Sequence, residues 1–222
     1  MKRPSTLRFK TTRRIAIASR LGTAAETLGE LRNGVSLTGA TAGQFSAIDA
    51  LEHMANEMVA ADCMVSTWTT GIYDVERAAA LKANGNLRRV RMLLDKATFE
   101  KSPQFAGPLI DALGVDAFRC LSVHAKVIVV RGERGTCAWR SSMNLNKNLR
   151  SEQFDLDVSE EVGGFWAEWF EALWDAAGIG VDNAAVMGAV FDRWQDAGKY
   201  SGRGATPPNG RIVMRNPWLA AT

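Results

Sequence analysis

The sequence predicts an α/β fold: one mixed, mostly parallel sheet flanked by helices on both faces, in a single domain with basic terminal extensions. Apolar runs of strand length alternate with segments of helical periodicity, as in strand–helix–strand units. The chain has 222 residues, of which 46% are hydrophobic and 23% charged, enough for a sizeable core. We find no internal repeat in the sequence, which favours one domain over an array.

Charge divides the chain into a body and two basic ends. Residues 1–20 contain seven Lys or Arg and no acidic residue, and residues 201–222 contain Arg203, Arg211 and Arg215 without an acid. The overall net charge is +3, so the remainder carries about −7. Basic ends suit a polyanion, because neutralised phosphates release counterions, but a solvated tail that aids solubility explains them equally well. We predict an N-terminal arm with one short helix, a domain, a helix packed on it and a flexible tail: residues 1–40, 41–178, 179–200 and 201–222.

Cysteine and hydropathy patterns exclude several classes of protein. Cys63, Cys120 and Cys137 lie in apolar surroundings without C-x-x-C spacing, which argues against a disulfide framework or a zinc site. The apolar stretch after the basic start ends at Arg20, too early for a signal peptide, and no run reaches the length of a membrane span. We therefore expect a soluble, cytoplasmic protein that uses no metal and no cofactor and does not bind a membrane.

The first strong helical pattern covers residues 44–61. Its apolar residues recur at helical spacing: Phe45, Ile48, Leu51, Ala55, Met58 and Val59. Thr41 is placed to cap this helix, with Gln44 three residues later. His53 falls on the polar face, which predicts a surface histidine.

Strands and helices then alternate along the chain. The predicted strands are 63–68, 87–95, 121–130, 136–140 and 152–159, and the predicted helices are 73–85, 103–114, 163–178 and 182–198. The strands 121–130 and 136–140 are joined by a short turn and predict a hairpin, with Trp139 packing inside it. Phe165, Trp166, Trp169, Phe170 and Leu173 form an apolar stripe typical of packing. The run RRVR at 88–91 predicts a strand end with solvated guanidinium groups.

Polar residues gather around the strand 121–130. His124 and Lys126 are two positions apart, so an extended chain projects both from one face. Burying an unpaired ammonium is costly, and an anionic partner offsets that cost. Ser142 and Asn144 follow the hairpin, and Glu152 opens the next predicted strand.

This arrangement of H-x-K, hairpin, S-x-N and carboxylate resembles the signature of the phospholipase D superfamily, and the resemblance covers about residues 44–176. The sequence departs from the family pattern at Arg131, where the family often has Asp, and at Ser141, where it has Gly. The Lys126-to-Asn144 gap is about three residues longer than usual and the Asn144-to-Glu152 gap about three shorter, so Asp155 rivals Glu152 for the carboxylate role.

The resemblance implies phosphodiester cleavage without a metal. His124 is then the nucleophile that forms a phosphohistidine, while Lys126, Asn144 and Ser142 hold the phosphate oxygens. Glu152 accepts a hydrogen bond from the other imidazole nitrogen. The family uses a second H-x-K histidine as the general acid, and His53 lacks that motif, so the resemblance implies a homodimer with the active site at its two-fold axis.

Three functions fit these features. The leading hypothesis is a phosphodiesterase that acts as an endonuclease on nucleic acid, DNA or RNA, because the ends are basic. The first alternative is a phospholipase D-type lipid hydrolase or transferase, for which only the aromatic helix at 163–178 offers an interfacial face. The second is a nucleic-acid-binding dimer of the same fold that has lost turnover.

Overall fold

The computed structural model describes residues 13–18, 22–95, 111–145 and 150–177. Its elements in chain order are β1 (Arg13–Ala18), α1 (Ala24–Leu28), β2 (Val35–Thr41), α2 (Ala47–Met58), β3 (Ala61–Thr67), α3 (Ile72–Ala83), β4 (Leu87–Leu94), the 3₁₀ helix η1 (Val115–Ala117), β5 (Phe118–Cys120), β6 (Val127–Gly132), β7 (Gly135–Ser141), β8 (Glu152–Val158) and α6 (Glu160–Ala176).

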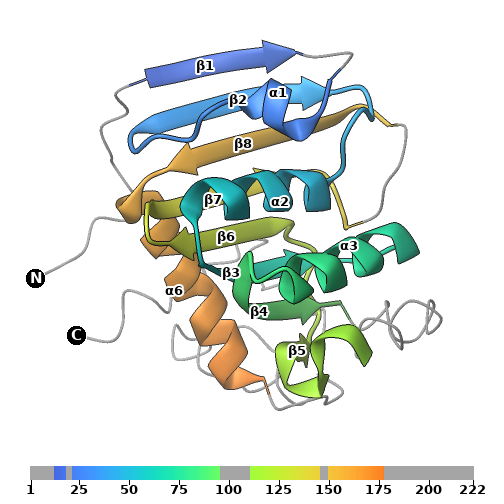
Figure 1. The fold of residues 1–222 in the computed structure, drawn as a ribbon. Helices are drawn as coiled ribbons and strands as arrows, with labels where there is room; N and C mark the ends of the chain where they lie inside the picture. The colour runs from blue at the N-terminus through green and yellow to red at the C-terminus, as the bar shows by residue number, and fades with distance from the viewer. Residues whose placement is uncertain (1–12, 19–21, 96–110, 146–149, 178–222) are drawn as a thin grey trace, which may run out of the picture.

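The strands form one eight-stranded sheet in the order β1-β2-β8-β7-β6-β3-β4-β5 (Figure 1). This confirms the mixed α/β class predicted from the sequence. Among the described strands, three pairings are parallel and four are antiparallel, so parallel pairs are fewer than expected. The antiparallel excess arises because β6, β7 and β8 run as a meander in the middle of the sheet, and because β6 and β8 also pair antiparallel with β3 and β2.

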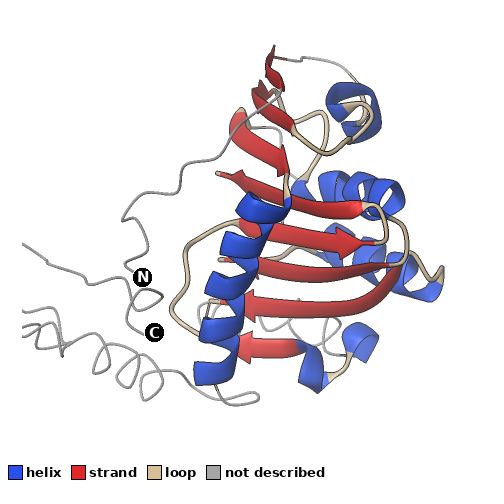
Figure 2. Cartoon of the chain, turned by 90° about the vertical axis from the view of Figure 1, so that its left-hand side faces the viewer, coloured by secondary structure: helices blue, strands red, loops and turns tan. Residues whose placement is uncertain are grey.

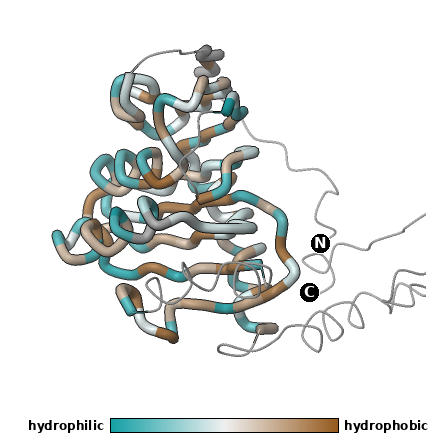
Figure 3. The backbone as a smooth tube through the Cα atoms, turned by 90° about the vertical axis from the view of Figure 1, so that its right-hand side faces the viewer, coloured by the Kyte–Doolittle hydropathy of each residue, from teal (hydrophilic) through white to brown (hydrophobic). Residues whose placement is uncertain are grey.

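Helices cover both faces of the sheet, as predicted. Figure 2 shows α6 crossing one face while α1, α2 and α3 cover the other. The two faces carry separate apolar clusters, one under α2 that includes Ile128 and Trp139, and one under α6 that includes Val127 and Val129. Adjacent β6 residues thus face opposite clusters, which is the alternation of an extended strand. The tube in Figure 3 shows apolar segments along the central strands and hydrophilic turns on the outer sides of helices.

The predicted hairpin is present. β6 and β7 pair antiparallel from Val127 opposite Arg140 to Gly132 opposite Gly135. Trp139 is fully buried, and its ring stacks on Phe154 of β8 with centroids 4.6 Å apart and planes 10° apart. Trp139 therefore packs the core, as expected, and has no face available to a ligand.

The N-terminal region is more structured than an arm. Residues 13–18 and 35–41 form β1 and β2, and β2 pairs antiparallel with β8, with Leu37 opposite Leu156. The helix α1 between them has a capping box, because Glu26 accepts from the backbone N–H of Thr23 at 2.7 Å. The boundary predicted at residue 40 thus cuts through the sheet. The sequence of β1 and β2 alternates only weakly, and the strands form through pairing: β2 pairs with β8, which is far away in sequence, and β1 pairs with β2.

Several predicted helices and ends lie outside the described residues. These are residues 1–12, the predicted helix at 182–198, the tail at 201–222 and most of the predicted helix at 103–114. Among the residues that the structure describes, no helix combines the length and the apolar character that crossing a membrane requires.

The helix predicted at 44–61 is α2, but it starts later. Thr41 is the last residue of β2, and Ser46 caps the helix instead. Asp49 accepts from the backbone N–H of Ser46 at 2.8 Å and from its hydroxyl at 3.0 Å. His53 is partly exposed, in agreement with the predicted surface position, and its Nε2 lies 2.7 Å from the carbonyl oxygen of Gly29 at the end of α1.

The basic run at 88–91 is divided by the sheet. Arg88 and Arg89 are exposed, as predicted, but Arg91 is only 8% exposed. Both terminal nitrogens of Arg91 donate to the carboxylate of Glu171 on α6. Its guanidinium also lies over Phe170 and Trp174, 5.5 and 5.4 Å from the two ring centroids. A salt bridge and two aromatic rings therefore compensate for burying this charge.

Candidate active site

The predicted site residues lie at one end of the central strands. These strand ends are on the right-hand side of Figure 1. β3 and β4 are parallel and end there, β6 and β8 begin there, and β7 ends there. Lys126 precedes β6, Ser142 follows β7 and Glu152 is the first residue of β8, so the topology brings these segments to the same end of the sheet's strands. Segments up to about 28 residues apart in sequence thus meet because the strands between them fold back as a meander.

His124 and Lys126 face one another. β6 begins only at Val127, so the strand predicted from residue 121 is shorter than expected and the H-x-K segment lies just before it. Nζ of Lys126 is 3.0 Å from Nδ1 and 3.1 Å from Nε2 of His124, and 2.8 Å from the His124 carbonyl oxygen. His124 is exposed and Lys126 is half-buried. The imidazole and the ammonium therefore share one small space that is open to solvent.

Three neighbouring strands hold this segment. Ser66 of β3 donates its hydroxyl to the Ala125 carbonyl at 2.9 Å, and Ser141 of β7 donates its backbone N–H to the Lys126 carbonyl at 3.1 Å. The backbone N–H of Val123 donates to Asp95 at 3.0 Å. Two side chains and one backbone N–H thus hold the backbone of this segment, although it is not part of the strand itself.

The charge of Lys126 is only partly matched. Burial lowers the pKa of the Lys126 ammonium, and the charges of Glu152 and Asp95 act in the opposite direction without reversing the shift. Among the described residues, no carboxylate forms an ion pair with Lys126. An anion beside this ammonium would replace the solvation that burial has removed.

Ser142 and Asn144 lie on a turn that follows β7. The hydroxyl of Ser141 accepts from the backbone N–H of Met143 at 3.0 Å, so the residue that stands where the family has Gly shapes this turn. Ser142 is tied to β8, with Gln153 donating its N–H to the Ser142 hydroxyl at 3.1 Å. Asn144 lies in the chain between Met143 and Leu145, which line a small pocket together with Lys126.

The Asn144 amide is not saturated. Its Oδ1 atom is buried and accepts no hydrogen bond within the part of the chain that the structure describes. A buried amide oxygen without a partner costs free energy, and such atoms are found at sites that receive a ligand or water. No hydrogen bond joins Ser142 or Asn144 to His124 or Lys126 among the described residues.

Glu152 lies on the site's face of the sheet but not where it was expected. Its carboxylate accepts from the hydroxyl of Ser142, and in the described part of the chain no hydrogen bond joins it to His124. The predicted Glu152–imidazole contact is thus replaced by a Glu152–Ser142 contact. Asp155 lies on the opposite face, because residues of β8 alternate and its neighbours Phe154 and Leu156 belong to the cluster under α2. The register therefore favours Glu152 over its rival.

Arg131 lies away from the strand ends that carry the site. It is exposed near the far end of β6, five residues beyond Lys126, which corresponds to roughly 16 Å along a strand. The departure from the family pattern at this position thus does not alter the immediate surroundings of the imidazole.

Two neighbours of the site were missed in the sequence. Trp68 directly follows β3, and its ring centroid is 5.6 Å from that of His124. Asp95 directly follows β4 and holds Val123. Their position in the sequence could have indicated them, since both lie at the end of a predicted strand. Ligands of open α/β sheets usually bind at the carboxyl ends of the parallel strands.

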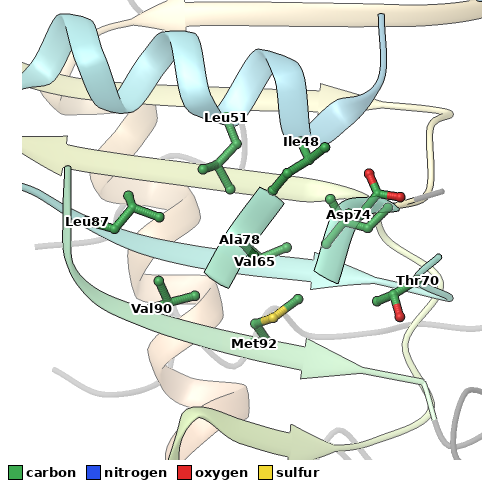
Figure 4. A pocket seen from close by; sticks show the side chains of 10 residues that line it. Ile48, Leu51, Val65, Thr70, Asp74, Ala78, Leu87, Val90 and Met92 are labelled. Atoms are coloured by element: carbon green, nitrogen blue, oxygen red, sulfur yellow. The ribbon is translucent and has the colours of Figure 1, made fainter. Parts of the chain in front are cut away.

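Other hollows are less suited to chemistry. Figure 4 shows a pocket between α2, α3 and the strands β3 and β4, with apolar walls except for Thr70 and Asp74 at one end. A shallow hollow beside the site is lined by Thr41, Gly43, Phe45, Ser46, Ala47, Met143, Arg150 and Glu152. Within the described ranges, no three His, Cys, Asp or Glu side chains are grouped as a ligand set for a metal ion.

Comparisons with known proteins give structural similarities at low sequence identity. No family model and no curated protein matches the chain. Among solved structures it is similar to Nuc from Salmonella typhimurium, a phospholipase D family member, with 14% identity, a TM-score of 0.49, and coverage of 66% of this chain and 98% of that one. It is also similar to TrmBL2, an archaeal chromatin protein with a novel mode of DNA binding, with 12% identity, a TM-score of 0.40, and coverage of 59% and 49%.

Proposed function

We propose that this chain is a phosphodiesterase that cleaves nucleic acid as an endonuclease, without a metal, through a phosphohistidine on His124. The observation that carries the proposal is the exposed imidazole held within hydrogen-bond distance of an ammonium that has no carboxylate ion pair among the described residues. A nucleophile beside an unmatched positive charge suits attack on an anionic phosphorus centre.

The first half of the reaction forms the phosphohistidine. One ring nitrogen of His124, in the neutral imidazole, attacks phosphorus, and a P–N bond forms as the P–O bond to the leaving oxygen breaks. The ammonium of Lys126 stabilises the charge on the non-bridging oxygens, with the amide of Asn144 as a second contact. Ser142, which donates to Glu152, orders the turn that carries Asn144.

The leaving oxygen needs a proton, and this chain has no second H-x-K histidine to supply it. His53 is engaged with the Gly29 carbonyl at the end of α1. We therefore propose an isologous homodimer in which the imidazolium of His124 of the partner subunit gives its proton to the leaving oxygen. The resulting imidazole then deprotonates water, which attacks phosphorus, breaks the P–N bond and restores both histidines.

The experiment is cleavage of plasmid, single-stranded DNA and RNA by the full chain in excess EDTA. We expect cleavage by the wild type, loss of at least about a thousandfold in His124→Ala, and unchanged activity in the control His53→Ala. A phosphorylated His124, stable to base and labile to acid, should accumulate in quenched reactions. Binding without cleavage would favour a decayed binding protein, and turnover of phospholipid alone would favour the lipid enzyme; both would overturn the proposal.

Mixing variants tests the shared site. Heterodimers of wild type and His124→Ala contain one intact imidazole, so a site that needs two histidines should be inactive in them. Activity should then fall as the square of the wild-type fraction when the two chains are refolded together. A linear fall, or a monomer mass in solution, would contradict the dimer while leaving the role of His124 intact.

A further inference from the structure

We propose that Ser66 and Thr67, the last two residues of β3, are positioning residues that hold the H-x-K segment and the S-x-N turn in a fixed relative arrangement. The inference rests on the proposed function and goes beyond it, because it adds to the site two residues that belong to neither motif. Each acts through the backbone beside a reacting side chain, and neither has to touch the substrate.

Ser66 holds the backbone between the imidazole and the ammonium. Its hydroxyl donates to the carbonyl oxygen of Ala125 at 2.9 Å, and Ala125 lies between His124 and Lys126 in the chain. Ala125 precedes β6, so a side chain supplies the donor that a ladder partner supplies inside a strand. Ser66 is only 1% exposed, which leaves little room for water to replace its hydroxyl.

Thr67 holds the turn that carries the amide. Its Oγ1 accepts from the backbone N–H of Leu145 at 3.2 Å, and Leu145 directly follows Asn144. The same hydroxyl donates to the carbonyl oxygen of Thr69 at 2.9 Å, which fixes its proton and leaves its lone pairs for Leu145. Thr67 is also 1% exposed, so this contact lies in the interior.

One strand end reaches both segments because adjacent residues of a strand point to opposite faces. Met64 belongs to the apolar cluster under α6, and Val65 belongs to the cluster under α2. Ser66 continues the face of Met64, and Thr67 continues the face of Val65. Leu145 is a member of the cluster under α2, on the face that Thr67 takes. The end of β3 therefore holds the H-x-K segment from one face and the S-x-N turn from the other.

The geometry of the site should depend on both hydroxyls. Without its donor, the Ala125 carbonyl is left unmatched in buried surroundings, and the segment must move to reach another partner. A displacement of about 1 Å can cost about 100-fold in rate. We expect kcat to fall by about 10- to 100-fold in Ser66→Ala and in Thr67→Val, with KM within about twofold, because the groups that bind the substrate are still present.

A matched control comes from the other end of the strands. Thr136, near the start of β7, is also 1% exposed, and its hydroxyl donates to Glu160 at 2.9 Å. Thr136→Val thus removes an equally buried hydroxyl without touching the site, and its kcat should match that of the wild type. Thr67→Ser keeps the hydroxyl and should restore kcat to within about threefold of wild type. Thermal melting checks that each variant is folded.

A second readout does not need cleavage. The chain has two histidines, so the ring signals of isotope-labelled histidine in an NMR spectrum can be assigned with His124→Ala. Ser66→Ala should move or broaden the ring signal of His124 and leave that of His53 unchanged. Thr136→Val should leave both signals in place.

The two readouts separate the positioning role from the proposed function. Normal kcat in Ser66→Ala and Thr67→Val, or an equal fall in Thr136→Val, would overturn the positioning proposal. An unchanged ring signal of His124 in Ser66→Ala would overturn it as well. A wild type that cleaves no nucleic acid would refute the proposed phosphodiesterase, and the ring signal would still decide whether Ser66 positions the imidazole.

Discussion

Arg91 lies within β4 and Lys126 directly precedes β6, and the two basic side chains differ in how completely the chain compensates their charge. Arg91 donates to both oxygens of Glu171 and lies over two aromatic rings. Lys126 contacts His124 and, among the described residues, has no ion-paired carboxylate. The guanidinium of Arg91 is paired with Glu171, joins β4 to α6 and has no group left for a ligand. The ammonium of Lys126 lacks such a pair and retains the capacity to bind an anion.

The largest expected effect is a loss of cleavage rate when the charge of Lys126 is removed. Lys126→Gln should reduce the cleavage rate by about 100- to 1,000-fold, because the transition state loses its nearest cation. Its melting temperature should stay close to that of the wild type, since the ammonium has no internal ion pair to lose. Steady-state kinetics and a melting curve check both parts, and a large loss of stability with normal kinetics would erase the distinction between the two cations.

Removing the charge of Arg91 should lower the stability of the protein and leave its cleavage activity nearly unchanged. Arg91→Ala leaves a gap between Phe170 and Trp174 and leaves Glu171 unpaired, so the free energy of unfolding should fall by about 2 kcal/mol. This figure is below that for fully buried pairs because the side chain of Glu171 is 40% exposed and water can solvate it. Urea denaturation measures the change. Cleavage at a temperature where the variant is folded should stay within about twofold of wild type.

The salt bridge between Arg91 and Glu171 should also make the stability of the protein depend on pH in the acid range. The hydrogen bond from Arg91 holds the pKa of Glu171 below its ordinary value of 4.5. A lowered carboxylate pKa contributes stability that is present above the unfolded value and is lost as pH falls through the folded value. We therefore expect Glu171→Gln to be less stable than wild type at neutral pH, by about 1 kcal/mol or less, and to converge with it as pH falls through the lowered pKa of Glu171. Melting temperatures across the acid range measure this, and parallel curves would contradict it.

The smallest expected effect is a shift of the alkaline limb of activity. Burial lowers the pKa of Lys126 from 10.5, so activity should decline at a lower pH than an ordinary lysine would dictate. The charge of Glu152 raises this pKa, so Glu152→Gln should move the limb to still lower pH. Asp155→Asn, on the opposite face, should leave the limb in place and serves as the matched control. A limb that moves equally in both variants would mean that the effect of Glu152 is not local.

Local patterns were sufficient for much of the fold. Period-two and helical runs located β3, β4, β7, β8, α2 and α3, and the hairpin required only a short turn between two apolar strands. They were insufficient at the edges of the sheet. β2 forms because β8 offers an edge to pair with, and β1 pairs with β2 in turn. Ser46 rather than Thr41 caps α2 because β2 extends through Thr41.

The sequence by itself determined which side chains carry the proposed chemistry: H-x-K and S-x-N are short motifs, and two-residue spacing places His124 beside Lys126 wherever the chain is extended. Only the tertiary structure decided their neighbours. Glu152 contacts Ser142 rather than the imidazole, Trp68 lies against His124, and Arg91 is buried under α6. Alternation along a strand tells which face a residue takes, but strand order and register decide what stands opposite, and those depend on contacts between segments far apart in the chain.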